Sequence, residues 1–213
     1  MLADARAEGA DRWLLGGDMA AFGAWPAETV DRLRALDGAT WIRGNTERWL
    51  NDRSDLPAGQ PMHAAALACR EELGDAVADE LATLPQRASL PPTTLAVHAS
   101  PVSDMRSFAR EARDDDAELL GDVHDGRLAF GHTHVAFRRR AGPVELVNPG
   151  SVGMPLDGDP RAAYALVGDD DAVRLRRVAY DHAESAAELV RRFGEEPWVA
   201  IIRGRLEHAR LAP

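Results

Sequence analysis

The sequence contains no lysine, so all 25 basic residues are arginines, and 35 acidic residues leave a formal net charge of −10. A chain with this charge repels polyanions, so we expect no strong binding to nucleic acids. The triplet Arg138-Arg139-Arg140 is the densest basic run, but Gly142 and Pro143 follow it closely. We therefore interpret the triplet as a solvated hairpin end and not as a phosphate-binding patch.

Cysteine is almost absent, since the chain has Cys69 alone. An internal disulfide is excluded, which suits a reducing cytoplasm. Cys69 lies in an alanine-rich helical run and is predicted to be a buried structural thiol. The chain also lacks the run of about eighteen apolar residues that a membrane-spanning helix needs. Because the segment Met1–Glu8 has no apolar signal-peptide core, we expect a cytoplasmic protein without membrane contact.

Short apolar runs alternate with helical stretches along the chain, which predicts one α/β domain over residues 1–213. Strands are expected at 12–15, 40–42, 93–97, 127–130, 144–147, 162–167 and 173–180. Helices are expected at 1–9, 28–36 and 115–120, and from 183 onward with a break at 194–197. A helix-rich stretch occupies much of residues 51–90, which we interpret as a helical insert over one face of the domain.

Polar residues of metal-binding type follow directly after five of the predicted strands. They are Asp18, Asn45, His98, His132 and Asn148. Taken singly these signals are weak, because Gly-Asp and Asn-Pro-Gly usually form turns and a lone histidine usually packs in a core. In a layered α/β domain, however, the loops at the carboxyl ends of strands gather in one crevice. The five side chains are therefore predicted to converge.

The pair His132-Thr133-His134 is the most specific of these fragments, because two imidazoles on one turn can reach adjacent metal ions. Such pairs also occur in amidohydrolases, but there they follow the first strand, and this one lies past the middle of the chain. They occur in metallo-β-lactamase-type hydrolases as well, but the expected aspartate and histidine are replaced here by Val135-Ala136-Phe137. The other histidines match no motif and are interpreted as surface or packing residues: His63, His124, His182 and His208.

Together the fragments resemble the calcineurin-like metallophosphoesterases, in which they occur in the same order. The fragments are Gly17-Asp18, Gly44-Asn45-Thr46-Glu47, Val97-His98-Ala99-Ser100 and Gly131-His132-Thr133-His134. Two later fragments, 148–153 and 158–162, resemble the small bacterial and archaeal phosphodiesterase branch of that superfamily. The resemblance runs from Asp11 to Val167 and implies a four-layer α-β-β-α sandwich of two mixed sheets.

The resemblance also implies a pair of divalent metal ions. Asp18 would bridge the two ions, and Asn45, His98 and His132 would complete the first site, while His134 would belong to the second. This donor set suits Mn, Fe, Zn or Ni. Catalytic roles would fall to Asn45, His132 and His134. The residues expected to support the ligands are Glu47, Ser100, Asn148 and Ser151.

The implied activity is hydrolysis of a small-molecule phosphate ester, as a phosphodiesterase or a phosphatase. The attack on phosphorus would be in line and would use a metal-activated hydroxide. A homo-oligomer is compatible with the sequence. The alternative function is a phosphoesterase fold without turnover that serves as a binding or scaffold protein.

The chain departs from the family pattern in two places. Thr46 stands where the family often has a histidine, and a threonine hydroxyl is too weakly acidic to serve as a general acid at neutral pH. The family also opens with a strand ending in Asp-x-His, and no Asp-x-His precedes Asp18 here. We expect that Met1 is an internal start and that the first strand is missing, and the alternative is a genuine loss.

This second departure divides the predicted ligands unequally between the two metal sites. The second site would keep only Asp18 and His134, so it is expected to bind metal weakly. The first site would be well formed, with four ligands: Asp18, Asn45, His98 and His132.

Overall fold

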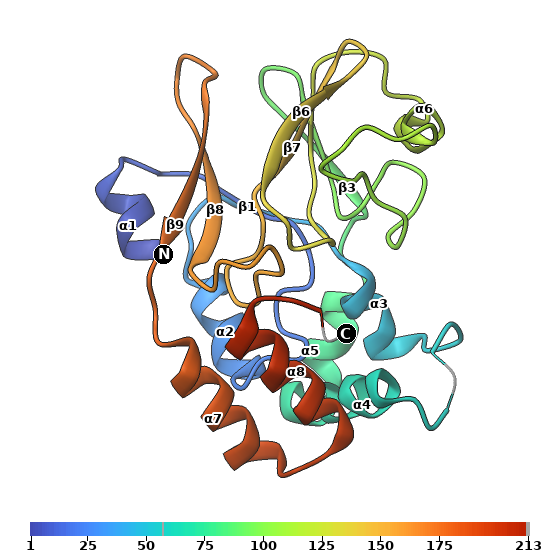
Figure 1. The fold of residues 1–213 in the computed structure, drawn as a ribbon, viewed down its shortest axis with the longest axis vertical. Coiled ribbons are helices and arrows are strands. Elements are labelled where there is room, and N and C mark those ends of the chain that lie inside the picture. Colours follow the sequence, from blue (N-terminus) through green and yellow to red (C-terminus); the bar gives the residue numbers. More distant parts are fainter. Residues whose placement is uncertain (57, 212–213) are drawn as a thin grey trace.

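The structure is a computed structural model that describes residues 1–56 and 58–211. Figure 1 shows the strands gathered in one half of the molecule and most of the helices in the other. The helices are α1 (Leu2–Ala7), α2 (Pro26–Arg34), α3 (Asn45–Asn51), α4 (Pro61–Leu73), α5 (Asp75–Ala82), α6 (Asp116–Leu120), α7 (His182–Phe193) and α8 (Pro197–His208). The strands are β1 (Trp13–Leu15), β2 (Ala39–Trp41), β3 (Arg87–Leu90), β4 (Thr94–Val97), β5 (Arg127–Ala129), β6 (Phe137–Ala141), β7 (Val144–Asn148), β8 (Ala162–Val167) and β9 (Val173–Val178).

The largest sheet is mixed and has the strand order β3-β4-β5-β7-β6. Its three central strands are parallel, and the two edge strands run antiparallel to their neighbours. β1 and β2 form a separate parallel pair, and β8 and β9 form an antiparallel hairpin. The predicted α/β class is confirmed. The four-layer sandwich of two sheets stays a prediction, because backbone hydrogen bonds divide these strands into three sheets.

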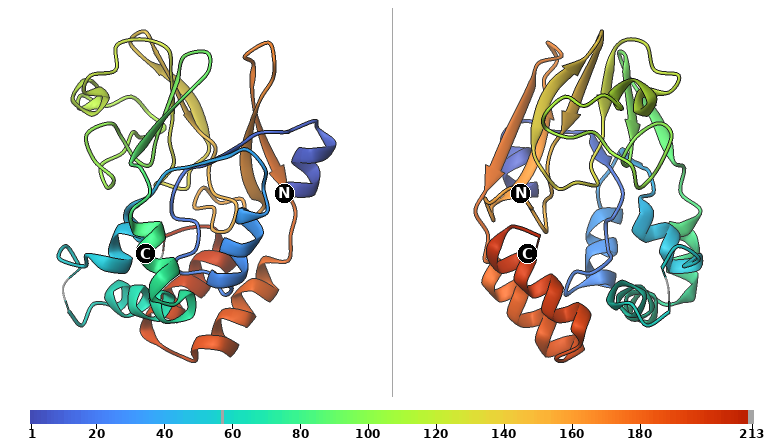
Figure 2. Two further views of the ribbon diagram at one scale, coloured as in Figure 1. Left: turned by 180° about the vertical axis from the view of Figure 1, so that it is seen from behind. Right: turned by 45° about the vertical axis from the view of Figure 1, so that its right-hand side comes forward.

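The parallel strands place their carboxyl ends together. β4, β5 and β7 end on the same edge of the large sheet, and the loops that follow them turn toward the helical half of the molecule (Figure 2). The loop after β1 is tied to the loop after β4, because His98 Nδ1 lies 2.8 Å from the carbonyl oxygen of Gly16. This arrangement brings together the loops that carry the predicted ligands.

Three apolar clusters hold these layers in place. One lies against the large sheet and includes Phe108, Leu128 and Leu146. A second joins α2, α4 and α5, and it contains Cys69, which is 3% exposed, so the predicted buried thiol is confirmed. The third joins α7 and α8 to the loop after β1 and to α3, through the residues Phe22, Trp49, Leu189, Trp198 and Ile202. The two last helices are thus packed against the face that carries the strand-end loops.

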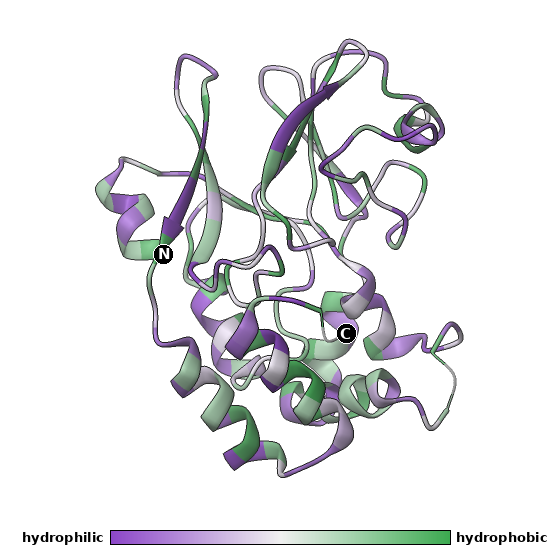
Figure 3. Cartoon of the chain, in the orientation of Figure 1, coloured by the Kyte–Doolittle hydropathy of each residue, from purple (hydrophilic) through white to green (hydrophobic). Residues whose placement is uncertain are grey.

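The interpretation of Arg138-Arg139-Arg140 as a solvated hairpin end is confirmed, because the triplet leads into the turn of the β6–β7 hairpin and Arg138 and Arg140 are exposed, although β6 was not among the expected strands. These residues lie inside β6, where Phe137 and Ala141 are buried, and the turn comes afterwards at Gly142. The guanidinium of Arg139 pairs with Asp116 at 2.7 Å, and Arg138 pairs with Glu145. Figure 3 shows the hydrophilic colour of this strand. The strand was not predicted because its arginines are polar, although its two end residues, Phe137 and Ala141, are buried.

Two further elements were not expected. α3 begins at Asn45 itself, and β3 occupies the last part of the segment that was interpreted as a helical insert. α4 and α5 confirm that residues 61–82 are largely helical. Whether residues 51–90 form an insert in a single domain stays a prediction. No helix among the described residues is long and apolar enough to cross a membrane.

Candidate metal centre

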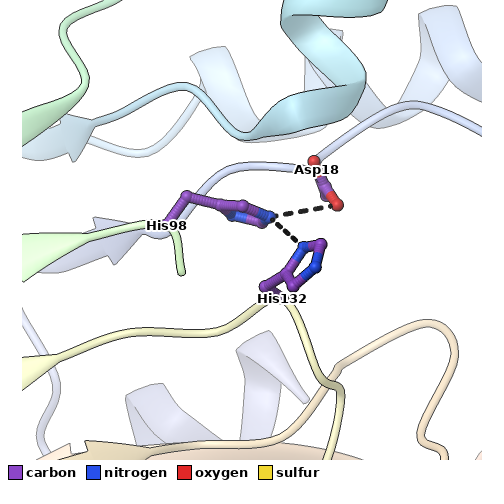
Figure 4. A group of neighbouring side chains, drawn as sticks. All are labelled: Asp18, His98 and His132. Carbon is purple, nitrogen blue, oxygen red and sulfur yellow. Dashed lines mark hydrogen bonds and ion pairs between the residues drawn. The ribbon is translucent and has the colours of Figure 1, made fainter. Parts of the chain in front are cut away.

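Four side chains, from three loops and the start of α3, lie close together, and we call them the four-residue cluster: Asp18, Asn45, His98 and His132. Asp18 follows β1, Asn45 opens α3, His98 follows β4 and His132 follows β5. Figure 4 shows Asp18, His98 and His132 pointing toward one another from separate segments. The convergence predicted for these four residues therefore occurs.

The distances within the cluster fit ligands that share one metal ion. His98 Nε2 lies 3.3 Å from Asp18 Oδ2, 3.0 Å from Asn45 Oδ1 and 3.3 Å from His132 Nδ1. His132 Nδ1 lies 2.9 Å from the same Asn45 oxygen. Ligand atoms placed tetrahedrally around Zn²⁺ at ordinary bond lengths are about 3.4 Å apart. In the metal-free protein the Nε2–H of a protonated His98 can bridge these acceptors, and a metal ion would take the place of that proton.

The orientation of His98 also suits a ligand. Its Nδ1–H donates to the carbonyl oxygen of Gly16 at 2.8 Å, which leaves Nε2 facing the cluster. Histidines that bind metals usually donate their other ring N–H to a carbonyl or carboxylate, which fixes the tautomer and the ring plane. The side chain is 3% exposed, so the ring has little freedom to turn away.

Asp18 is oriented by the residue that departs from the family pattern. The amide N–H and the hydroxyl of Thr46 both donate to Asp18 Oδ1 at 2.9 Å. The other carboxylate oxygen, Oδ2, is left to face His98. Thr46 therefore positions a candidate metal ligand, and its hydroxyl proton is already engaged.

Glu47 connects the loop after β1 with the start of α3. Its buried carboxylate accepts hydrogen bonds from the backbone N–H groups of Asp18, Met19 and Gly44, at 2.7, 2.8 and 2.7 Å. Burial, together with the negative charge of Asp18, raises the pKa of Glu47. Three N–H donors aimed at one carboxylate offset part of the cost of burying it.

Two glycines allow the loops to approach this closely. A Cβ on Gly44 would lie 2.2 Å from Asp18 Oδ1 and 2.7 Å from a carbon of the His98 ring. A Cβ on Gly17 would lie 2.4 Å from the backbone nitrogen of Gly44. These contacts are shorter than van der Waals separation, so only glycine fits at either position.

The backbone is strained at the candidate ligands. Asp18, His132 and His134 have φ angles of 56°, 63° and 58°, in the left-handed region. Such conformations are uncommon for residues other than glycine, cost on the order of 1–3 kcal/mol each and occur frequently at functional sites. Two of these residues, Asp18 and His132, belong to the four-residue cluster.

The structure places His134 beside the cluster and not within it. Its Nδ1–H donates to the carbonyl oxygen of Met154 at 2.7 Å, so Nε2 is left free to act as an acceptor. The Met154 N–H in turn donates to Ser151 Oγ at 3.1 Å, so Ser151 holds the loop that orients His134. Sequence reasoning missed Met154, because its contribution is a backbone carbonyl and leaves no trace in residue type.

Asn148 and Ser100 are buried but do not reach the four-residue cluster. The Asn148 amide donates to the Gly131 carbonyl at 2.8 Å and to Thr133 Oγ1 at 3.0 Å, on the turn that carries His132. Ser100 donates to the Ser103 carbonyl at 3.3 Å. Asn148 therefore supports the turn and is not itself placed as a ligand.

The two histidines of the cluster have pKa values that are shifted in opposite directions. Burial works to lower the pKa of His98, but the ion pair and hydrogen bond with Asp18 outweigh it and raise the pKa to about 9. Burial and the neighbouring charge of His98 lower the pKa of His132 to about 4. The pKa of Asp18 is lowered, because His98 and Thr46 together outweigh the effect of burial. At neutral pH the metal-free cluster therefore carries one imidazolium and one neutral imidazole.

These pKa values predict how metal binding depends on pH. A metal ion at His98 Nε2 must displace a proton whose pKa is about 9, so binding is weakened at pH 7. We expect the affinity for Mn²⁺ to rise about tenfold per pH unit from pH 7 toward 9. Titration calorimetry at pH 7.5 in buffers of different ionisation enthalpy should count about one proton released per ion. An affinity that does not change with pH, with no proton released, would contradict this assignment.

Comparison with known proteins places this geometry in a family. A family model for the calcineurin-like phosphoesterase superfamily domain matches residues 1–171. A metallophosphoesterase from Sphaerobacter thermophilus is 26% identical, with 98% of this chain and 93% of that chain covered and a TM-score of 0.77. A hypothetical protein from Pyrococcus horikoshii OT3 has the same fold, with a TM-score of 0.80, 18% identity and coverage of 99% and 91%. No curated protein gave a match. The chain belongs to the calcineurin-like phosphoesterase superfamily.

Proposed function

We propose that this protein is a metal-dependent phosphoesterase in which Asp18, Asn45, His98 and His132 hold a divalent metal ion. The observation that carries the proposal is the meeting of their four donor atoms: four of the distances between them lie between 2.9 and 3.3 Å. Membership of the superfamily supports the chemistry. Of the candidate metals, Mn, Fe, Zn and Ni all accept this combination of imidazole nitrogen and hard oxygen.

Each residue has a distinct task in this proposal. Asp18 supplies negative charge, and Asn45 adds a neutral oxygen that lies between both imidazoles. His132 is already unprotonated at neutral pH because burial lowers its pKa, so its Nδ1 is ready to bind. When bound, the metal ion would polarise the phosphate ester and lower the pKa of the attacking water. A second, weaker metal position would be served by Asp18 and by Nε2 of His134, whose Nδ1 is already bonded to the Met154 carbonyl.

The substrate that we propose is a small-molecule phosphate ester. We expect the purified protein with added Mn²⁺ to hydrolyse bis-p-nitrophenyl phosphate, and a chelator to abolish the reaction. The variant His132→Ala should lower kcat/KM by about a hundredfold or more, since it removes a ligand from the best-formed site. Spectrophotometric assays on the diester and on p-nitrophenyl phosphate would measure this loss and decide between diesterase and monoesterase activity.

A matched control separates loss of a ligand from loss of any histidine. His124 is exposed, and it precedes β5 at the opposite end of the strand from His132. The variant His124→Ala should therefore keep the activity of the original protein. If the protein binds Mn²⁺ but hydrolyses neither ester, the result favours the scaffold function.

A further inference from the structure

Arg205 on α8 is partly buried, and its side chain makes no hydrogen bond or ion pair within the part of the chain that the structure describes. Its Nε is buried, and among residues 1–56 and 58–211 no hydrogen bond or ion pair is made by that atom. Burial alone lowers the pKa of this arginine. Other sheltered arginines are paired with carboxylates, as Arg127 is with Glu145 and Arg139 is with Asp116. Burying part of a cation without an opposite charge costs free energy, and an anion bound to the accessible end of the guanidinium would offset that cost.

Within the described residues, two other buried polar atoms lack a hydrogen-bond partner, but another atom of the same side chain does make a hydrogen bond. These atoms are Arg43 Nε and Asp157 Oδ1. Arg43 donates through Nη1 to the Ala82 carbonyl at 2.9 Å, and Asp157 accepts from the Ala136 N–H at 3.0 Å. Arg205 differs because its guanidinium has no such second bond within the described residues.

Arg205 lies on the helix whose end is tied to the loop beside the candidate metal centre. The N–H of Gly158 donates to the carbonyl of Ala209 at 2.9 Å, which ties the end of α8 to the loop that contains Met154. The Met154 carbonyl receives the His134 hydrogen bond, and Leu206 belongs to the same apolar cluster as Met154. The positive charge of Arg205 is among the influences that lower the pKa of His134, after the larger effect of burial. Figure 1 shows α8 below the loops at the strand ends.

We propose that Arg205 binds the phosphate group of the substrate beside the metal centre. A guanidinium offers a planar set of N–H donors that matches two phosphate oxygens, and it stays charged at any physiological pH. A phosphate there would pair with the partly buried cation, and this pairing would contribute to substrate binding. The inference rests on the proposed function and adds a substrate-binding residue from the C-terminal helix, far in sequence from the metal ligands.

The test uses the full chain loaded with Mn²⁺ and inorganic phosphate as the probe. We expect Arg205→Met to weaken phosphate binding, measured by calorimetry and as inhibition of ester hydrolysis, by about tenfold or more. KM for the ester should rise by a similar factor, and the affinity for Mn²⁺ should change by less than about twofold. Arg205→Lys should recover part of the phosphate affinity, since it restores the charge but not the fork of donors.

A thermal unfolding measurement separates this role from a structural one. Without phosphate, Arg205→Met should melt no lower than the original protein, because it replaces an unpaired cation by an apolar side chain of similar length. Added phosphate should raise the Tm of the original protein and leave that of the variant unchanged. Arg203→Ala is the matched control on the same helix, since Arg203 is 38% exposed and pairs with Glu195 at 3.6 Å.

The outcomes distinguish this inference from the proposed function. If no ester is hydrolysed but phosphate still stabilises the protein through Arg205, the inference stands and the proposed function fails. Unchanged phosphate affinity in Arg205→Met overturns the inference. A lower Tm of that variant without phosphate also overturns it, because the loss would show that the guanidinium has a structural partner.

Discussion

Replacing Gly44 with alanine is expected to abolish tight metal binding and, with it, activity. The new methyl group would lie 2.2 Å from Asp18 Oδ1 and within 3 Å of the His98 ring, so both candidate ligands must move. The backbone itself tolerates the change, because Gly44 has a φ of −99°. The effect therefore comes from displaced ligand atoms and not from backbone strain. We expect the affinity for Mn²⁺ to fall by about a hundredfold, the upper range for disturbing the surroundings of a metal ligand.

The neighbouring sequence supplies a close control for this substitution. A Cβ at Gly16 would meet no atom within 4 Å, although the Gly16 carbonyl accepts the hydrogen bond from His98. Gly16→Ala should keep that carbonyl in place and bind Mn²⁺ as the original protein does. Calorimetric titration of both variants measures the difference. Equal affinities in Gly44→Ala and Gly16→Ala would show that the close approach of Gly44 to Asp18 and His98 has no part in metal binding.

Replacing Glu47 with alanine is expected to destabilise the metal-free protein strongly. The substitution removes an acceptor that is 1% exposed and serves three backbone N–H groups. Each buried donor left without a partner costs about 1–3 kcal/mol, so a loss on the order of 4 kcal/mol in the free energy of unfolding follows. Urea denaturation in the presence of a chelator measures this value. The same change should loosen the loop that carries Asp18.

A surface glutamate provides the comparison for this measurement. Glu71 on α4 is exposed, and Glu71→Ala should change the free energy of unfolding by less than about 0.5 kcal/mol. Glu47→Gln keeps the volume of the side chain but turns one acceptor into a donor that faces backbone N–H groups, so an intermediate loss is expected. If Glu47→Ala is as stable as Glu71→Ala, the buried carboxylate does not hold the two loops together.

The positions of the candidate ligands could be predicted because each follows a short apolar strand. Parallel strands end on one edge of a sheet, so residues just after β4 and β5 had to lie near each other. Asp18 and Asn45 followed the same rule from β1 and β2. The pattern carried no information on distances within the cluster. It also did not show that His134 would bond to a backbone carbonyl beside the cluster.

The elements that were missed lacked a local signal of the expected kind. β6 has three consecutive arginines between its two buried positions, so its mean polarity resembled that of a turn. The start of α3 could have been predicted from the sequence. Glu47 stands three residues after Gly44 and accepts its N–H, as in a capping box. Arg205 had no such signal at all. The role that we propose for it depends on its position in the folded chain, near residues that lie far away in the sequence.

The central claim is that Asp18, Asn45, His98 and His132 hold a divalent metal ion. Anomalous X-ray diffraction from crystals soaked in Mn²⁺ tests it most directly, because the signal locates the ion without reference to activity. We predict a strong peak at bonding distance, roughly 2.0–2.2 Å, from His98 Nε2, His132 Nδ1, Asn45 Oδ1 and an oxygen of Asp18. A second peak beside His134 should be weaker. The absence of a peak among these four side chains, or a strong peak elsewhere only, would contradict the claim.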